Sequence, residues 1–136
     1  MSIFAIGDLH LPGGDKKPMD VFGAHWERHF ERICADWQSR VKPEDIVLIP
    51  GDISWAMQLG DALNDLREIA KLPGTILLLR GNHDYWWTTT RKMETFLTAN
   101  GFDTLHILHN NACTVGNVAP VSYTHLRAHE TLANLV

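Results

Sequence analysis

The chain has 136 residues, which fits one domain of the usual size of roughly 100–150 residues, and its 45% apolar and 21% charged content is ordinary for a globular protein. A formal net charge of -4 argues against a broad nucleic-acid-binding or anionic-membrane surface. No segment approaches the roughly 20 apolar residues of a membrane span. The N-terminus also lacks the basic and apolar regions of a signal peptide, so we expect a cytoplasmic protein.

Short apolar runs without polar alternation predict buried strands. They cover residues 3–6 (IFAI), 46–49 (IVLI) and 76–79 (ILLL). Strands that are covered on both faces, as in a parallel sheet between helices, have this pattern. Two further strands are predicted at residues 104–108 and 113–118.

Helical periodicity fills the intervals between these runs. Residues 26–37, 59–70 and 89–99 each place apolar side chains on one helical face. The apolar positions are Trp26, Phe30, Ile33 and Trp37, then Leu59, Ala62, Leu63, Leu66, Ile69 and Ala70, then Met93, Phe96 and Leu97. The resulting βαβαβαβ order predicts an α/β fold with right-handed crossovers.

Each of the first three runs ends in glycine followed by residues that can bind metal. The sequences are Gly-Asp-Leu-His at residues 7–10, Gly-Asp at 51–52 and Gly-Asn-His-Asp at 81–84. The carboxyl ends of parallel strands converge on one crevice, so these residues are expected to meet there. The glycines are expected to allow sharp turns and close approach to a ligand.

The spacing of Asp8 and His10 is informative. On an extended chain, positions i and i+2 point to the same side, which makes the two side chains neighbouring ligands for one ion. A mixed oxygen and nitrogen site suits Mn, Fe, Zn or Co. Taken alone, a Gly-Asp pair is more often an ordinary turn or helix cap, and His83 could merely hydrogen-bond its neighbours. Three strand ends with such residues are much harder to attribute to chance.

The ordered motifs resemble those of the calcineurin-like metallophosphoesterases. The surrounding segments GDISWAMQL and RGNHDYWW are similar to a bacterial branch of that family, and the resemblance covers residues 1 to about 118. It implies a four-layer α/β/β/α sandwich, of which this chain supplies the N-terminal half. An isolated half would leave apolar sheet surface and an edge strand uncovered.

The resemblance also implies a centre with two divalent metal ions of the Mn, Fe, Zn or Co type. Asp8 and His10 would bind the first ion, Asp52 would bridge both, and Asn82 would bind the second and contact phosphate. Such a centre holds its ions roughly 3.5–4 Å apart and activates a hydroxide for in-line attack on phosphorus.

Two further residues receive catalytic roles from the resemblance. His83 would lie over the substrate, stabilising charge or protonating the leaving oxygen. Asp84 would orient His83 and fix its tautomer. The implied activity is hydrolysis of phosphomonoesters or phosphodiesters by a metal-activated hydroxide.

The chain departs from the family pattern after residue 84. The family continues with a lone histidine and a Gly-His-x-His element, and this sequence contains no Gly-His-x-His. The metal shell implied for this chain is therefore incomplete, and the phosphatase is expected to be truncated. His106, His109, His125 and His129 could be considered as replacement metal ligands, but histidines of this kind more often face solvent.

We therefore predict a partial metallophosphoesterase domain at residues 1–119. Residues 120–136 (PVSYTHLRAHETLANLV) resemble artefactual ends of open reading frames, and we expect a non-native or disordered tail. Two alternatives to an enzyme stay open: a non-catalytic metal- or phosphate-binding module, and an inactive fragment. The expected partner is a phosphate-ester small molecule or a phosphoprotein, and the sequence does not distinguish between the two. It makes no prediction of the oligomeric state.

Overall fold

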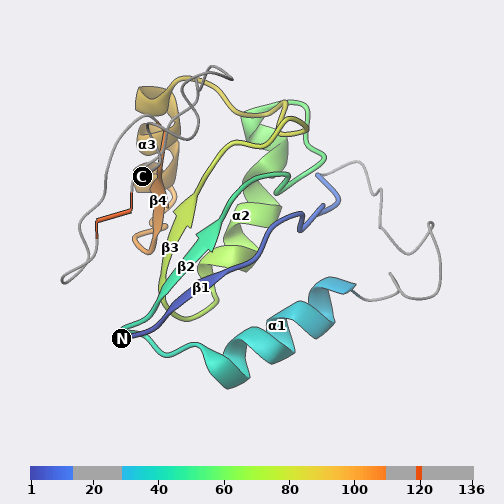
Figure 1. Cartoon of the computed structure of the whole chain (residues 1–136). Helices are drawn as coiled ribbons and strands as arrows, with labels where there is room; N and C mark the ends of the chain where they lie inside the picture. Colours follow the sequence, from blue (N-terminus) through green and yellow to red (C-terminus); the bar gives the residue numbers. More distant parts are fainter. Residues whose placement is uncertain (14–28, 110–118, 121–136) are drawn as a thin grey trace, which may run out of the picture.

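The computed structural model describes residues 1–13, 29–109 and 119–120. Its elements follow the predicted alternation of strands and helices (Figure 1). They are β1 (Ile3–Ala5), α1 (His29–Arg40), β2 (Ile46–Ile49), the 3-10 helix η3 (Leu59–Ala62), α2 (Leu63–Ala70), β3 (Thr75–Leu78), α3 (Thr90–Ala99) and β4 (Leu105–Ile107). The predicted strand at 113–118 and the predicted tail, apart from Pro120, lie outside the described residues.

The four strands form one parallel sheet in the order β1-β2-β3-β4. Chain order and spatial order coincide, so each connection between neighbouring strands crosses over through a helix. The predicted α/β class and βαβαβαβ order are confirmed. All strands point in one direction, so the loops after β1, β2 and β3 gather at the same end of the sheet (Figure 1).

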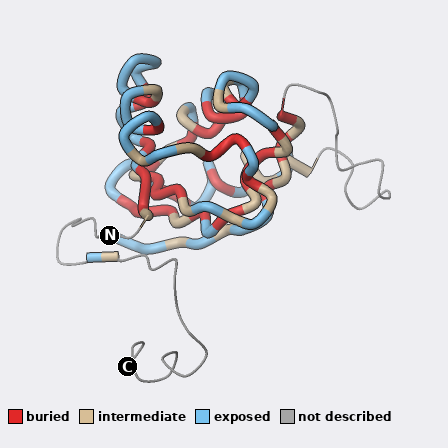
Figure 2. Tube along the Cα trace, turned by 90° about the horizontal axis from the view of Figure 1, so that it is seen from above, coloured by how far each residue is buried: buried red, intermediate tan, exposed pale blue. Residues whose placement is uncertain are grey.

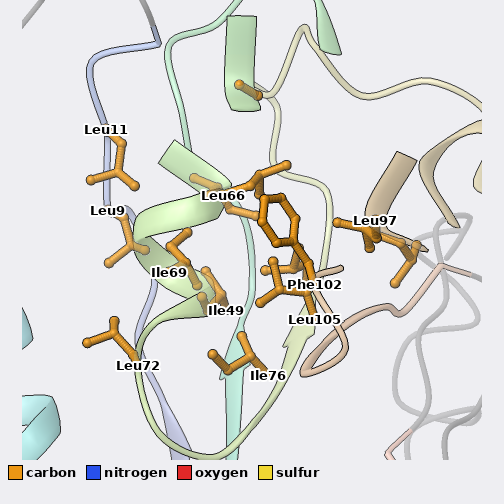
Figure 3. Close-up of a cluster of buried hydrophobic side chains, with 14 of the residues drawn as sticks. Leu9, Leu11, Ile49, Leu66, Ile69, Leu72, Ile76, Leu97, Phe102 and Leu105 are labelled. Carbon is orange, nitrogen blue, oxygen red and sulfur yellow. The ribbon is translucent and has the colours of Figure 1, made fainter. Parts of the chain in front are cut away.

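All three helices contribute to one main core on a single face of the sheet. Ile49 of β2 and Ile76 of β3 lie at its centre, against Leu66 and Ile69 of α2 (Figure 3). Each of these four side chains is completely buried. Trp37 of α1 belongs to the same cluster. The described residues thus form a helical layer and a sheet, as expected for the N-terminal half of the sandwich.

The opposite face of the sheet carries a smaller cluster. Ile46, Leu77 and Leu108 are buried there, with Leu48 and Leu79 packed against them. Alternate residues of the inner strands therefore reach two cores, which explains why the sequence shows no polar alternation.

The first apolar run was predicted to be buried, and this prediction is wrong for β1. Within the described residues β1 pairs only with β2, so it forms an edge of the sheet. Ile3 is 46% exposed, and only Phe4 of this strand is partly covered. In Figure 2 the segment that follows the N-terminus is accordingly mostly pale blue. Edge position, which periodicity does not reveal, decides the exposure of this strand.

The predicted helices differ from the structure mainly at their ends. The helix predicted at 26–37 is described as α1 from His29 onward, so Trp26 lies outside the described residues. The helix predicted at 59–70 begins with the 3-10 turn η3. α3 begins after Thr89, whose hydroxyl accepts a hydrogen bond from the backbone N–H of Lys92 at 3.3 Å, as an N-cap should. Among the described residues, no helix has the length and apolar character that crossing a membrane requires.

Candidate metal centre

The segments after β1 and β2 remain paired beyond the ends of the strands. The backbone N–H of Asp8 donates to the Gly51 carbonyl at 3.1 Å, and that of His10 donates to the Asp52 carbonyl at 3.0 Å. The backbone N–H of Leu11 then donates to the Ile53 carbonyl at 2.9 Å. This pairing brings the first two sequence motifs side by side.

Asp8, His10 and Asp52 form a group able to hold a metal ion. One ligand atom from each residue lies within 4.8 Å of the others. Asp8 is exposed, whereas His10 and Asp52 are half-buried, so the group is open to solvent on one side. Two carboxylates and one imidazole form a donor set that fits a divalent transition ion.

These three residues share an unusual backbone conformation. Asp8, His10 and Asp52 have φ angles of 58°, 47° and 51°, and no other non-glycine residue in the described ranges has a positive φ. The left-handed region costs a residue with a side chain roughly 1–2 kcal/mol. Residues in this conformation cluster at functional sites, although Asp and His adopt it more readily than other non-glycine residues.

The third motif lies against the Asp52 carboxylate. The His83 backbone N–H donates to Asp52 Oδ1 at 2.9 Å, and His83 Nδ1 lies 3.2 Å from Asp52 Oδ2. With its amide nitrogen facing the carboxylate, Asn82 Nδ2 lies 3.1 and 3.3 Å from the two Asp52 oxygens. Desolvation raises the pKa of Asp52, but hydrogen bonds from His83 and the nearby His83 and His10 charges outweigh it, so the net pKa is lowered.

Asp84 was predicted to orient the His83 ring, and in the structure its carboxylate lies among backbone N–H groups of the neighbouring loops. Its buried carboxylate accepts hydrogen bonds from other groups, and His83 contacts Asp52 instead. The donors are the backbone N–H groups of Asp52 (2.8 Å), Ile53 (2.7 Å), Ser54 (3.3 Å) and Gly81 (2.7 Å), and the Trp86 indole (3.1 Å). Asp84 therefore fastens the loop that carries Asp52 to the loop that carries Asn82 and His83.

Two of the three motif glycines permit close contact between these loops. Gly51 has a φ of 126°, and a Cβ there would lie 2.6 Å from the Gly81 Cα. A Cβ on Gly81 would overlap the Asp52 backbone nitrogen. Gly7 meets no such restriction, since its nearest atom would be Pro50 Cγ at 3.4 Å. The close approach that Gly51 and Gly81 permit in the structure is between two backbone segments.

Sequence reasoning missed a second buried carboxylate beneath the site. Asp65 Oδ2 accepts hydrogen bonds from the Gly13 backbone N–H at 2.8 Å and from Ser54 Oγ at 2.7 Å. Burial raises the pKa of Asp65, although these hydrogen bonds oppose the effect. Its signal was present in the sequence, because Asp65 lies three residues after Ala62 and four before Ile69, on the apolar face of the helix.

The aromatic residues beside the motifs differ in their burial and in their contacts. Trp86 and Trp87, which closely follow the third motif, are both buried in the main core. Trp55, which sequence reasoning did not single out, stacks on His10 with ring centroids 5.0 Å apart. Tyr85 is 54% exposed and meets the His83 ring edge-on at 6.3 Å.

The remaining histidines do not join the group in the described part of the chain. His106 is exposed on β4, and His109 is half-buried with its ring 6.2 Å from that of Trp87. His125 and His129 lie outside the described residues.

The chain is thus an α/β protein whose candidate ligand residues lie at the carboxyl edge of a parallel sheet, where such sheets bind their ligands. The family model of the calcineurin-like phosphoesterases matches residues 1–131. The chain therefore belongs to the calcineurin-like phosphoesterase family, whose members are metal-dependent phosphoesterases, as the motifs predicted.

The chain is similar to a solved structure, the crystal structure of a protein of unknown function, AQ665 from Aquifex aeolicus. The TM-score is 0.50 and the sequence identity 22%, over 83% of this chain and 54% of that protein. The likeness concerns the fold, and this chain spans about half the length of that relative. No curated protein matches.

Proposed function

We propose that this chain provides the metal-binding and leaving-group elements of a phosphoesterase that hydrolyses phosphate esters. The strained backbone of Asp8, His10 and Asp52 carries the proposal, since the described non-glycine residues in the left-handed region are the same three that can bind a metal. Divalent ions held there would polarise a phosphate ester and lower the pKa of water.

In this proposal Asp8, His10 and Asp52 would hold one divalent ion, and Asp52 together with the amide oxygen of Asn82 would hold a second. The Asn82 side chain supports this role. If its amide oxygen rather than its nitrogen faces the Asp52 carboxylate, acceptors oppose one another. A cation between them would stabilise that orientation, so metal binding and an amide flip would occur together.

His83 is proposed to stabilise charge or protonate the leaving oxygen. Its Nδ1 faces Asp52, and its Nε2 makes no hydrogen bond within the described part of the chain. The side chain is 42% exposed, so Nε2 can reach a bound ester. Asp52 thereby has a second task, which is to hold the His83 ring in place.

The experiment combines metal binding with turnover. Thermal unfolding of the chain would be followed with and without Mn²⁺, Co²⁺ or Zn²⁺, and hydrolysis of bis(4-nitrophenyl) phosphate would be measured under the same conditions. Asp52→Asn should remove the metal-dependent rise in unfolding temperature and lower turnover by roughly 100-fold or more, about 2.7 kcal/mol of transition-state stabilisation. The exposed Asp103→Asn is the matched control and should change neither quantity.

A second candidate is a metal- or phosphate-binding module without turnover. The observation that favours it is the missing Gly-His-x-His element, because the proposed ligands then fill only part of a two-metal shell. Metal-dependent stabilisation with hydrolysis supports the esterase, and stabilisation without hydrolysis supports the module. If Asp52→Asn leaves metal binding unchanged, the proposed ligand set is wrong.

The natural substrate in this proposal is a phosphate-ester small molecule or a phosphoprotein. An open, half-buried ligand group with an exposed His83 is compatible with either class.

A further inference from the structure

Trp55 lies between the two histidines of the candidate metal centre. Its ring is nearly parallel to that of His10, with centroids 5.0 Å apart and an angle of 23° between the planes. The same indole meets the His83 ring at 5.7 Å with a tilt of 55°. One side chain thus contacts a histidine from the loop after β1 and another from the loop after β3.

The backbone of Trp55 is fixed relative to the first motif. Its N–H donates to the Leu11 carbonyl at 2.9 Å, and Leu11 forms a parallel bridge with Ser54. Trp55 is therefore attached to the same short ladder that carries His10. The stacking distance depends on a rigid backbone connection and not only on side-chain packing.

The indole nitrogen of Trp55 has no hydrogen-bond partner within the described ranges, although it is buried. A buried N–H group without an acceptor is costly, so hydrogen bonding does not explain the position of this ring. The contacts of its aromatic face with the two histidines do.

Within the described residues, no hydrogen bond orients the His10 ring. A metal-binding histidine usually donates its second N–H group to a carboxylate or a carbonyl, which fixes the ring. In the described residues no hydrogen bond reaches the His10 ring, and its nearest charged group is Asp8 Oδ1, 4.0 Å from Nε2. The left-handed backbone of His10 adds a further need for support.

We propose that Trp55 is a positioning residue that orients His10 for metal binding by aromatic stacking, in place of the usual hydrogen bond. The inference rests on the proposed function, in which His10 is a metal ligand. Stacking fixes the plane of the imidazole, and in this plane one ring nitrogen lies within 4.8 Å of carboxylate oxygens of Asp8 and Asp52. Contact with His83 extends the same restraint to the residue that faces the leaving group.

The test compares Trp55→Leu and Trp55→Met, which remove the planar face, with Trp55→Phe, which retains one. Mn²⁺ affinity would be measured by isothermal titration calorimetry. The non-planar variants should bind Mn²⁺ roughly 10–100-fold more weakly, the loss usual for removal of a group that orients a ligand, and Phe should restore most of the affinity.

Trp87 provides the matched control. Its indole nitrogen, like that of Trp55, is buried and has no hydrogen-bond partner in the described residues, and its ring contacts are with Trp86 and His109. Trp87→Leu and Trp87→Phe should lower the unfolding temperature but leave the Mn²⁺ affinity of the folded protein unchanged. Equal losses of affinity in the Trp55 and Trp87 variants would show a general packing effect and overturn the inference.

A metal-free measurement tests the stacking itself. In the wild-type protein the His10 ring protons should be shifted upfield in the NMR spectrum by the indole ring current, with His10→Gln used to assign them. Unshifted signals would overturn the inference even if the non-planar variants fail to fold. If the wild type and Trp55→Leu bind Mn²⁺ with equal affinity, the positioning role of Trp55 is overturned, but the proposed function is not. No Mn²⁺ binding by the wild type overturns the proposed function and this role with it.

Discussion

At both ends of the parallel sheet, the loops need acceptors for their backbone N–H groups and contain residues with a positive φ. The two ends meet these needs with different residues. At the amino end, Asp45 accepts hydrogen bonds from the Ser2 and Lys42 backbone N–H groups, and Gly74 adopts the positive φ that the turn requires. At the carboxyl end, the Asp84 carboxylate accepts hydrogen bonds from four backbone N–H groups and from one indole N–H.

The difference lies in which residues adopt the left-handed conformation. In the turn before β3, the residue in the left-handed conformation is Gly74, and glycine adopts this conformation without a steric penalty. In the loops after β1 and β2, three non-glycine residues, Asp8, His10 and Asp52, have a positive φ besides Gly13 and Gly51, and for these three it is costly. One end is built for stability, and the other gives up stability to place ligand-type side chains.

The largest expected effect comes from removal of the Asp84 carboxylate. Asp84→Ala leaves five donors without their acceptor, and each buried unpaired donor costs roughly 1–3 kcal/mol, so we expect a loss of more than about 3 kcal/mol in the free energy of unfolding. Urea denaturation monitored by circular dichroism measures it. Asp45→Ala removes the acceptor of only two donors and should cost less. Equal losses would remove the distinction between the two ends.

A smaller effect, of opposite sign at the two ends, is expected from exchange of glycine and non-glycine residues. Asp8→Gly relieves left-handed strain, and after the entropy of glycine is subtracted the metal-free protein should gain up to about 1 kcal/mol. Gly74→Ala should cost roughly 1–3 kcal/mol. A Cβ there would lie 3.0 Å from Val41 Cγ1 and 3.1 Å from the Asp45 carbonyl oxygen.

Metal titration completes this comparison. Asp8→Gly should lose Mn²⁺ binding, whereas Gly74→Ala should retain it while folded, since the amino end lies away from the ligand group. Destabilisation by Asp8→Gly in the absence of metal would refute the interpretation of its φ angle as stored strain.

The smallest effect concerns the pH dependence of stability. Backbone hydrogen bonds from Lys42 and Ser2 lower the pKa of Asp45, whereas burial raises the pKa of Asp65. The stability due to Asp45 is therefore present above the unfolded pKa of about 3.9 and is lost as the pH falls through the lower folded value. The penalty of Asp65 is absent below about pH 3.9 and develops as the pH rises through the higher folded value.

Unfolding free energies at about pH 3 and at neutral pH, measured for Asp45→Asn and Asp65→Asn, test both signs. Relative to the wild type, Asp45→Asn should be most destabilising at neutral pH. The free energy of unfolding of Asp65→Asn, taken relative to that of the wild type, should be higher at neutral pH than at low pH. The same pH trend in both variants would contradict the opposite pKa shifts.

Much of the fold could be predicted from the sequence because its signals are local. Apolar runs without alternation gave β2 within its observed bounds and β3 to within one residue at each end, and helical periodicity gave α2 and α3. The convergence of Asp8, His10 and Asp52 could also be inferred, since the loops after parallel strands meet at one edge of the sheet. The same ordered motifs identified the family.

Only the tertiary structure decided the relations between loops distant in sequence. Asp84 comes directly after His83, yet its carboxylate bonds the amides of the loop after β2, because that loop presents unpaired N–H groups toward it. Exposure of β1 and the stacking of Trp55 on His10 likewise depend on which neighbours the sheet provides. Periodicity and motif spacing describe one segment at a time, whereas these features arise from the packing of segments against each other.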